Sequence, residues 1–253
     1  MTTHLKSNIQ PFFVNSIAKS GTHLVRPLLE GIPSLKHFAF IYPGKLQQLS
    51  EHKLILSKMP SNHFANGHIF YSKEYENMLH TLNLKQIFLY RDPRDIVVSY
   101  AYFYMKLKNT PPHRFFIENN MNVKQRLLAF INGFKTDYVY RGDINSWYRN
   151  FIEWKYADHV LPITYESLVK SKQSQRKVLA EIIRYLEIEN NPERINLLIK
   201  NMQENVDPIK SVTFRKGQSG NWKEEFDEKI KKHFKRVAGK LLIELGYEKD
   251  YNW

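Results

Sequence analysis

Short apolar runs and longer periodic stretches alternate along this chain. Short runs rich in β-branched or aromatic side chains are typical of buried strands, whereas apolar residues that recur every three or four positions are typical of helices. The pattern predicts strands over residues 12–16, 53–56, 86–90 and 160–164. It predicts helices over residues 22–30, 95–108, 123–134, 144–154 and 175–186.

Strands and helices in this alternating order indicate an α/β fold, in which helices flank a parallel β-sheet. The last third of the chain shows only the helical pattern, over residues 195–202 and 224–245. A chain of 253 residues fits one domain of this class, so we expect a single domain over residues 1–253. The stretch 109–122 is expected to be a surface loop, either a binding lid or a plain connection.

The segment that follows the first predicted strand has the composition of a phosphate-binding loop. It reads Asn-Ser-Ile-Ala-Lys-Ser-Gly-Thr-His over residues 15–23, and a helical pattern begins at its end. Backbone N–H groups and the positive end of a helix would face an anion there. The order of lysine and glycine differs from a Walker A loop, which disfavours an ATPase or GTPase. A simple helix cap by Ser20 or Thr22 is the alternative for this segment alone.

A second candidate follows the third predicted strand, where Arg91 comes directly after Tyr90. This position lies at the carboxyl edge of the sheet, where open α/β folds bind ligands. Ser99 comes four residues after Asp95 in a helical pattern, so the two share a helix face. An arginine and a serine in this arrangement can bind one phosphate together. The alternative is that Arg91 and Arg94 form ion pairs with Asp92 and Asp95.

A third candidate is the basic loop over residues 214–222, which contains Arg215, Lys216 and Gly217. Backbone N–H groups next to glycines, together with the two cations, would form a further anion site. A surface turn also uses such residues.

Charge and composition add two constraints. The formal charge of +13 at pH 7 indicates an anionic partner, although the cations of residues 229–236 alternate with apolar residues as on a solvated helix face. The chain has no cysteine, no run of apolar residues long enough for a membrane helix, and no secretory signal at its start. We therefore expect a cytoplasmic protein without a transmembrane segment.

These segments, in this order, resemble the cytosolic-type sulfotransferases that use 3′-phosphoadenosine 5′-phosphosulfate (PAPS), a branch of the P-loop nucleotide-binding fold. Two further segments share the resemblance: residues 163–168, Ile-Thr-Tyr-Glu-Ser-Leu, and the helical stretch around Trp147 and Trp154. The resemblance covers nearly the whole chain and implies a P-loop-type parallel sheet. It also implies an enzyme that transfers a sulfuryl group to a hydroxyl or amine.

The resemblance implies a role for each motif. The residues that would hold the 5′-phosphosulfate are Lys19, Ser20, Gly21, Thr22 and His23, with Lys19 reaching the oxygen that bridges phosphorus and sulfur. The residues that would hold the 3′-phosphate are Arg91, Ser99, Arg215, Lys216 and Gly217. Tyr165 would contact the adenine. The family's base-stacking tryptophan is replaced by Leu24.

The resemblance also implies a histidine base between the second predicted strand and the segment that contains Arg91 and Ser99. His68 fits the family's segment best and is the predicted base, while His63, which follows Pro60, is the alternative; His80 also lies in this interval. An imidazole can take the proton of an acceptor hydroxyl at neutral pH. Lys19 would act with it by stabilising charge on the leaving phosphate, and no metal is expected.

The acceptor is expected to be a small molecule, a lipid or a glycan, and no nucleic acid is expected as a partner. The oligomeric state stays open, since residues 223–228 lack the threonine-valine pair of the family's dimer segment. Two other classes remain as alternatives. One is a nucleotide-dependent kinase with a degenerate phosphate loop, which would require magnesium and ATP, and the other is a basic nucleic-acid-binding module.

Overall fold

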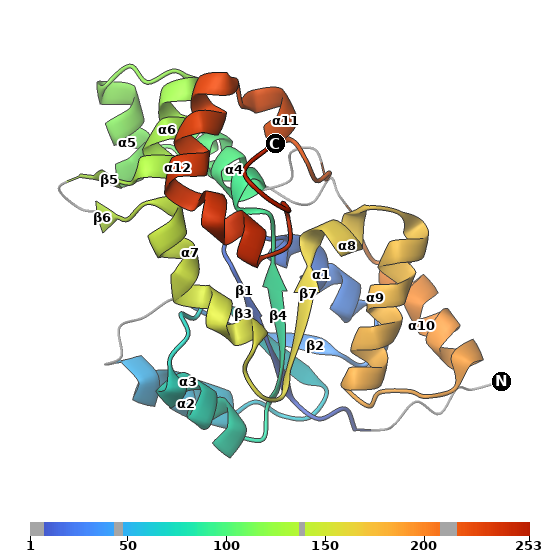
Figure 1. Ribbon diagram of the computed structural model, residues 1–253. Coiled ribbons are helices and arrows are strands. Elements are labelled where there is room, and N and C mark those ends of the chain that lie inside the picture. Colours follow the sequence, from blue (N-terminus) through green and yellow to red (C-terminus); the bar gives the residue numbers. More distant parts are fainter. Residues whose placement is uncertain (1–7, 43–47, 137–139, 208–216) are drawn as a thin grey trace. The chain divides into compact units, whose positions relative to one another are not determined.

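The computed structural model describes residues 8–42, 48–136, 140–207 and 217–253. It contains a five-stranded sheet in which all neighbouring strands are parallel (Figure 1). The strand order is β2-β3-β1-β4-β7. The bounds are Phe12–Ser16 for β1, Lys36–Ile41 for β2, His63–Gly67 for β3, Lys85–Tyr90 for β4 and Val160–Thr164 for β7. The predicted α/β fold, a parallel sheet flanked by helices, is therefore confirmed.

Two compact units divide the chain, and each is described on its own. The first comprises Met1–Tyr90 with Phe151–Gly217, and the second Arg91–Asn150 with Gln218–Trp253. Besides the sheet, the first unit contains α1 (Thr22–Glu30), α2 (Leu49–Ser57), α3 (Lys73–Thr81), η2 (Glu153–Lys155), α8 (Tyr165–Val169), α9 (Lys172–Tyr185) and α10 (Pro192–Glu204). The second contains α4 (Pro93–Lys106), α5 (Pro111–Glu118), α6 (Val123–Asn132), β5 (Phe134–Lys135), β6 (Tyr140–Arg141), α11 (Trp222–Glu225) and α12 (Glu228–Glu244); α7 (Ile144–Ile152) crosses the boundary.

Alternate residues of the strands build the main core of the first unit. Phe12 and Val14 of β1, with Ile87 and Leu89 of β4, point to one face and pack against α1, α9 and α10. Helices α2 and α3 lie on the other side of the sheet (Figure 1). Because all the strands are parallel, the loops after β1, β3, β4 and β7 leave the same edge of the sheet.

One of the four predicted strands is wrong. Residues 53–56 lie inside α2, where His52 and Leu56 are buried one turn apart while Leu54 is exposed. An apolar run this short does not distinguish a strand from a helix. Two strands of the five-stranded sheet, β2 and β3, were not predicted, nor was the short pair β5 and β6. In β3 the reason is its Asn66 and Gly67, which interrupt the apolar pattern although both are buried.

The predicted helices are present with shifted ends. The range 22–30 coincides with α1, whereas the predicted long C-terminal helix is divided into α11 and α12, with Asp227 as N-cap of α12. The stretch 109–122 is not a plain loop, since it contains α5. Thr110 and the two prolines that follow it begin this helix, and proline is favoured in a first helical turn.

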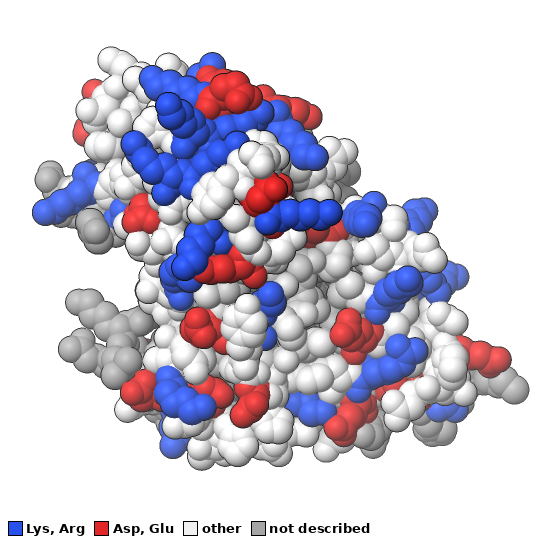
Figure 2. Space-filling view, viewed as in Figure 1, with Lys and Arg blue, Asp and Glu red and all other residues white. Residues whose placement is uncertain are grey.

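Helix α12 has an apolar side and a basic side. Its buried residues include Ile230, Phe234 and Leu241, at helical spacing. Three exposed cations, Lys229, Lys232 and Arg236, follow the opposite side, and Figure 2 shows Lys and Arg gathered over this helix. The predicted solvated basic face is confirmed.

Candidate functional site

The loop between β1 and α1 is shaped to receive an anion. Lys19 has φ of 74° and Gly21 φ of 102°, both in the left-handed region that non-glycine residues seldom adopt. Gly21 is the N-cap of α1; in the part of the chain that the structure describes, no side chain caps this end, and its first turn has no acidic residue. The terminal N–H groups and the positive end of the helix dipole are therefore available to an external anion.

Two hydroxyl groups of this loop differ in their bonding. Thr22 Oγ1 lies 2.8 Å from Ser16 Oγ. Ser20 is fully buried, and its Oγ has no hydrogen-bond partner among the described residues. A buried hydroxyl without a partner costs free energy, which an oxygen of a bound phosphate or sulfate would offset. Ser20 therefore fits its predicted place in an anion site.

Tyr165, the predicted adenine contact, lies against the same loop. It begins α8 directly after β7, and it is only 8% exposed. A Cβ added to Gly21 would lie 2.5 Å from Tyr165 Cδ2, a distance at which atoms overlap. Glycine is thus needed both for the positive φ and for this close approach. The structure brings Tyr165 to the phosphate loop, and its contact with adenine stays a prediction.

Leu24, which replaces the family's tryptophan, lies on α1 and packs against the main core of the first unit. An aliphatic side chain at this place contributes to the core.

The His68 side chain is held at the end of β1. His68 follows Gly67, the last residue of β3. Its Nδ1 lies 2.8 Å from the carbonyl oxygen of Ser16 and 3.1 Å from Ser16 Oγ. A carbonyl oxygen can only accept a hydrogen bond, so the proton belongs on Nδ1. Nε2 then has the lone pair, and it is the nitrogen that can take a proton from a substrate.

Burial and nearby charge keep this imidazole neutral. Burial lowers the pKa of His68 to about 4; the hydrogen bond to the Ser16 carbonyl opposes this change, and the proximity of His23 and Lys19, which disfavours a positive charge on His68, adds to it. The pKa of His23 is lowered by burial and then by Lys19 and Arg26. Both histidines are therefore unprotonated at pH 7. Ser16 Oγ lies 3.1 Å from His68 Nδ1 and 2.8 Å from Thr22 Oγ1, so the predicted base lies beside the phosphate loop within the first unit.

The other two histidines of the interval lie elsewhere. His63 is the first residue of β3, so four residues, about 13 Å of strand, separate it from Gly67. Its Nδ1 lies 2.9 Å from the Ser61 carbonyl oxygen, at the edge opposite to the phosphate loop. His80 lies in α3, with its ring 5.4 Å from that of His159. Neither position is close to the loop after β1.

Arg91 is held by a network inside the second unit. Its Nη2 donates to Asp95 Oδ2 at 3.3 Å and to the carbonyl oxygen of Gln218 at 3.2 Å. The carbonyl oxygen of Arg91 accepts from the hydroxyl of Tyr148 at 3.0 Å. These bonds fix Arg91 beside the loop that follows Gly217. The predicted second and third anion motifs are thus neighbours at Arg91 and Gln218.

Asp95 is the residue that organises this network, and sequence reasoning treated it only as an ion-pair partner. It is 1% exposed. Its Oδ2 accepts the N–H of Gly220 at 2.7 Å, and its Oδ1 accepts the N–H of Trp222 at 3.0 Å. The opposite charges of Arg91 and Asp95, four residues apart at the start of α4, were a signal for their pairing, but nothing in the sequence indicated the bonds to the distant loop.

Arg94 has a structural role. Its guanidinium binds both carboxylate oxygens of Asp92 and also Glu248. It lies 3.8 Å from the ring centroid of Trp222 and 4.6 Å from that of Trp253. The ion-pair alternative is therefore correct for Arg94, because its charge is already matched by two carboxylates.

The remaining predicted residues are only partly described. Ser99 lies on α4, four residues after Asp95, and is partly exposed. Gly217 has φ of 64°, a conformation that suits glycine. Arg215 and Lys216 lie outside the described residues, so their predicted role in the 3′-phosphate site is not tested.

The described residues offer neither a metal site nor a membrane-spanning helix. Within the described ranges, no group of three or more His, Cys, Asp or Glu side chains is placed to hold a metal ion. None of the helices that the structure describes has both the length and the apolar character needed to cross a bilayer.

Comparison with known proteins identifies the family. A family model described as "Sulfotransferase domain" matches residues 10–246. Sulfotransferase 1A1 of Mus musculus is 25% identical over 238 residues, which cover 85% of this chain and 72% of the relative. Human Sulfotransferase 2A1 is 27% identical over 183 residues, which cover 65% of this chain but only 58% of the relative.

Solved structures show the same fold at lower identity. Mouse sulfotransferase SULT7A1 complexed with PAP matches with a TM-score of 0.66 and 21% identity, over 93% of this chain and 84% of that one. Retinol dehydratase in complex with androsterone and inactive cofactor PAP matches with a TM-score of 0.61 and 20% identity, over 92% of this chain and 80% of that one. These similarities decide against the kinase and nucleic-acid alternatives. The chain belongs to the sulfotransferase family.

Proposed function

We propose that this protein transfers a sulfuryl group from PAPS to a hydroxyl or amine of a small-molecule, lipid or glycan acceptor. The observation that supports this proposal best is the hydrogen bond between His68 Nδ1 and the Ser16 carbonyl oxygen. This bond leaves Nε2 as a proton acceptor at the edge of the sheet from which the phosphate loop leaves. Family membership supports the reaction class, and the neighbours solved with PAP support the donor. A cytoplasmic location stays a prediction.

The first unit fits the sulfated end of this nucleotide. Lys19, Gly21 and His23 would surround the 5′-phosphosulfate, and the buried hydroxyl of Ser20 would gain the partner that it lacks among the described residues. Thr22 begins α1 beside them. Bound there, the nucleotide supplies an activated sulfuryl group.

The second and third predicted anion motifs would supply the 3′-phosphate site. We assign it to Arg91, Ser99 and Gly217, together with the cations Arg215 and Lys216. The guanidinium of Arg91 is held in place by Asp95 and Gln218, so little side-chain entropy is lost on binding. We assign the adenine contact to Tyr165.

His68 would act as general base. The acceptor oxygen forms a bond to sulfur as the bond from sulfur to the bridging oxygen breaks, and the acceptor proton passes to Nε2 of His68. The nucleotide leaves with the bridging oxygen and its electron pair. Lys19 and the N–H groups at the start of α1 would stabilise the charge that develops on this oxygen. This mechanism needs no metal ion.

Ligand-dependent stability tests the donor. Thermal unfolding is recorded with 3′-phosphoadenosine 5′-phosphate (PAP) and with ATP, each with and without magnesium. A ligand at a hundred times its dissociation constant adds about 2.7 kcal/mol, or roughly 5–10 °C in this size range. We expect PAP to raise the midpoint without magnesium. A shift with magnesium and ATP alone would contradict the assignment.

Replacement of His68 tests the base. We expect His68→Ala to lower turnover by about 10²–10⁴-fold, with PAP affinity nearly unchanged, because only proton transfer is lost. The matched control is His63→Ala, which changes a histidine at the opposite edge and should leave turnover as it was. Retained turnover in His68→Ala would refute its role as base.

A further inference from the structure

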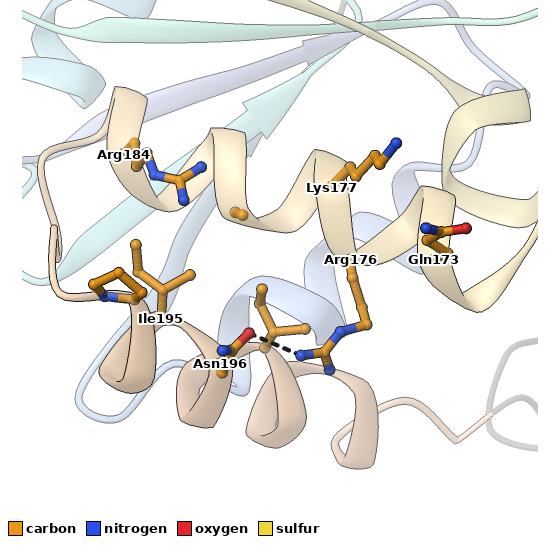
Figure 3. Close-up of a pocket in the computed structure, with 9 residues that line it drawn as sticks. Gln173, Arg176, Lys177, Arg184, Ile195 and Asn196 are labelled. Carbon is orange, nitrogen blue, oxygen red and sulfur yellow. Dashed lines mark hydrogen bonds between the residues drawn. The ribbon is translucent and has the colours of Figure 1, made fainter.

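A groove between α9 and α10 lies apart from every motif used above. It has a volume of about 450 Å³, and both helices belong to the first unit. Figure 3 shows the two helices side by side, with lining side chains from each. The lining residues are Gln173, Arg176, Lys177, Ala180, Arg184, Pro192, Ile195, Asn196 and Ile199. They follow one face of each helix, since neighbours in both sets are mostly three or four residues apart.

The floor of the groove is apolar. Ile195 and Ile199 are 2% and 1% exposed, and with Ala180 they form a nonpolar surface between the helices. Ile195 and Ile199 also belong to the main core, to which α9 contributes Val178 and Ile182. The groove is therefore built on a rigid part of the unit.

The walls of the groove are cationic. Arg176, Lys177 and Arg184 line it, and no acidic side chain does. Arg176 donates to Asn196 Oδ1 at 2.8 Å, as the dashed line in Figure 3 marks. Within the described residues, none of the three cations forms an ion pair. Lys177 forms none even with Glu181, which lies one turn away on the same helix.

Several cations elsewhere on the same unit have an acidic partner. Arg26 pairs with Glu30 at 3.1 Å, and Lys200 of α10 approaches Glu204 at 3.8 Å. Glu189, in the connection between α9 and α10, accepts from the backbone of Asn190 and Asn191 and lies 3.5 Å from Arg194. The excess positive charge of the groove is thus local.

We propose that this groove binds an anionic amphiphile, a molecule with a carboxylate, sulfate or phosphate group on a short hydrocarbon chain. The volume lies in the range of small-ligand sites and is too small for a folded partner. Arg184 binds the anionic group, because its guanidinium is a forked donor at one end of the groove. The chain lies on Ala180, Ile195 and Ile199.

The length of the groove suits a chain of about eight carbons. Arg176 and Arg184 are eight residues apart on one helix, which corresponds to about 12 Å along its axis. A chain of this length covers the apolar floor between them. The methylene stems of Arg176 and Lys177 cover its far end.

The test uses the full-length protein and octanoate as the probe. Spectra of Ile δ1-methyl groups follow Ile195 and Ile199 in the groove, with Ile96 of the second unit as reference. We expect saturable shifts of the two groove methyls only. The matched probes are 1-octanol, which lacks the anion, and acetate, which lacks the chain; both should bind at least about 10-fold more weakly.

Variants locate the anion. Arg184→Gln should weaken octanoate binding about 10-fold, while Lys200→Gln, on α10 outside the groove, should leave it unchanged. The measurement is repeated in saturating PAP, which separates this site from the nucleotide site. The proposal is overturned if the groove methyls do not shift, if 1-octanol binds as tightly as octanoate, if PAP abolishes the shifts, or if Arg184→Gln binds normally.

Discussion

Helices α1 and α4 follow neighbouring strands, β1 and β4, yet their N-termini are opposite in character. Helix α1 begins at Gly21, with neither a side-chain cap nor an acidic residue in its first turn as far as the described chain shows. Helix α4 begins at Asp92, whose side chain accepts from the backbone of Arg94, and Asp95 lies in its first turn. One helix end is left for an external anion, and the other already holds two carboxylates.

This difference indicates two ways in which the region around a helix N-terminus can bind an anion. At α1 the backbone would do the binding, so the loop has positive φ angles and a buried hydroxyl without a partner among the described residues. At α4 Asp92 caps the helix end, and Asp95 holds Arg91 in position. An arginine is needed there because the helix end itself no longer attracts an anion. Removal of the buried polar group at each end should therefore have opposite effects on the stability of the free protein: a loss for Asp95 at α4, and no loss for Ser20 at α1.

The largest effect is expected at α4. Asp95→Asn removes the buried charge that binds Arg91 and leaves one acceptor for the N–H groups of Gly220 and Trp222. Loss of one partner of a buried ion pair costs about 3–5 kcal/mol. We expect a loss of this size in the free energy of unfolding, measured with urea.

The control for this change is a surface pair of the same unit. Glu244→Gln removes the partner of Arg149, in a pair whose side chains are 39% and 42% exposed. Exposed pairs contribute about 0–1 kcal/mol, so the loss should be small. Equal losses in the two variants would mean that the α4 network is no stronger than a surface contact.

At α1 the expected effect of a backbone change is smaller. Gly21→Ala places a Cβ 2.5 Å from Tyr165 Cδ2, in a residue with φ of 102°. Such strain costs about 1–3 kcal/mol. We expect a loss of this size in unfolding free energy, together with weaker PAP binding by calorimetry, because the loop must shift.

The variant Gly246→Ala separates the backbone strain of a positive φ from the close contact with Tyr165. Gly246 has φ of 78°, but an added Cβ would meet nothing within 4 Å. Its cost should be about 1–2 kcal/mol from backbone strain alone, without any change in PAP affinity. If both variants bind PAP normally, the close approach of Tyr165 to Gly21 does not matter for the nucleotide.

The hydroxyl of Ser20 gives the sharpest contrast with Asp95. Ser20→Ala removes a buried group that has no partner within the described chain, so the free protein should keep its stability or gain up to about 1 kcal/mol. PAP affinity should fall about 10-fold, as measured by calorimetry. Thr22→Ala is the matched control; it breaks the bond to Ser16 and should cost the free protein about 1 kcal/mol. A destabilised Ser20→Ala would show that this hydroxyl already has a partner.

The sequence predicted the parts of the fold that depend on local pattern. Strands β1, β4 and β7 are continuous apolar runs, and α1 has clear helical periodicity, so their ranges were predictable. Strand β3 was not predictable, because contacts with neighbouring residues require Asn66 and Gly67 at their positions. A Cβ on Gly67 would lie 2.4 Å from the carbonyl oxygen of Ile41. Such requirements exist only once the sheet is assembled.

The site was predictable to the same extent. The motif residues Lys19, Ser20 and Gly21 are contiguous, and the family resemblance pointed to them and to Arg91. The tautomer of His68 was not predictable, since it depends on a carbonyl oxygen 52 residues away in the chain. The same holds for Asp95, which binds the backbone of residues 125 and 127 positions further on. Long-range polar bonds leave no periodic trace in a sequence.

The smallest expected effect concerns pH, and it tests the excess of positive charge around α1. Burial lowers the pKa of His68 to about 4, and Lys19 and His23 contribute, so its unprotonated form persists well below pH 6.5. The unprotonated fraction of a base with the ordinary pKa of about 6.5 would fall about 25-fold between pH 7 and 5, whereas that of His68 should fall by about a tenth. We therefore expect kcat/KM, which reports the free enzyme, to change less than about 2-fold over this range.

A bound anionic nucleotide favours the imidazolium, so the acid limb of kcat should lie at higher pH than that of kcat/KM. An acid limb of kcat/KM near pH 6.5 would mean that His68 is solvated like a surface histidine. The positive environment at the uncapped N-terminus of α1 would then not disfavour a charged imidazole.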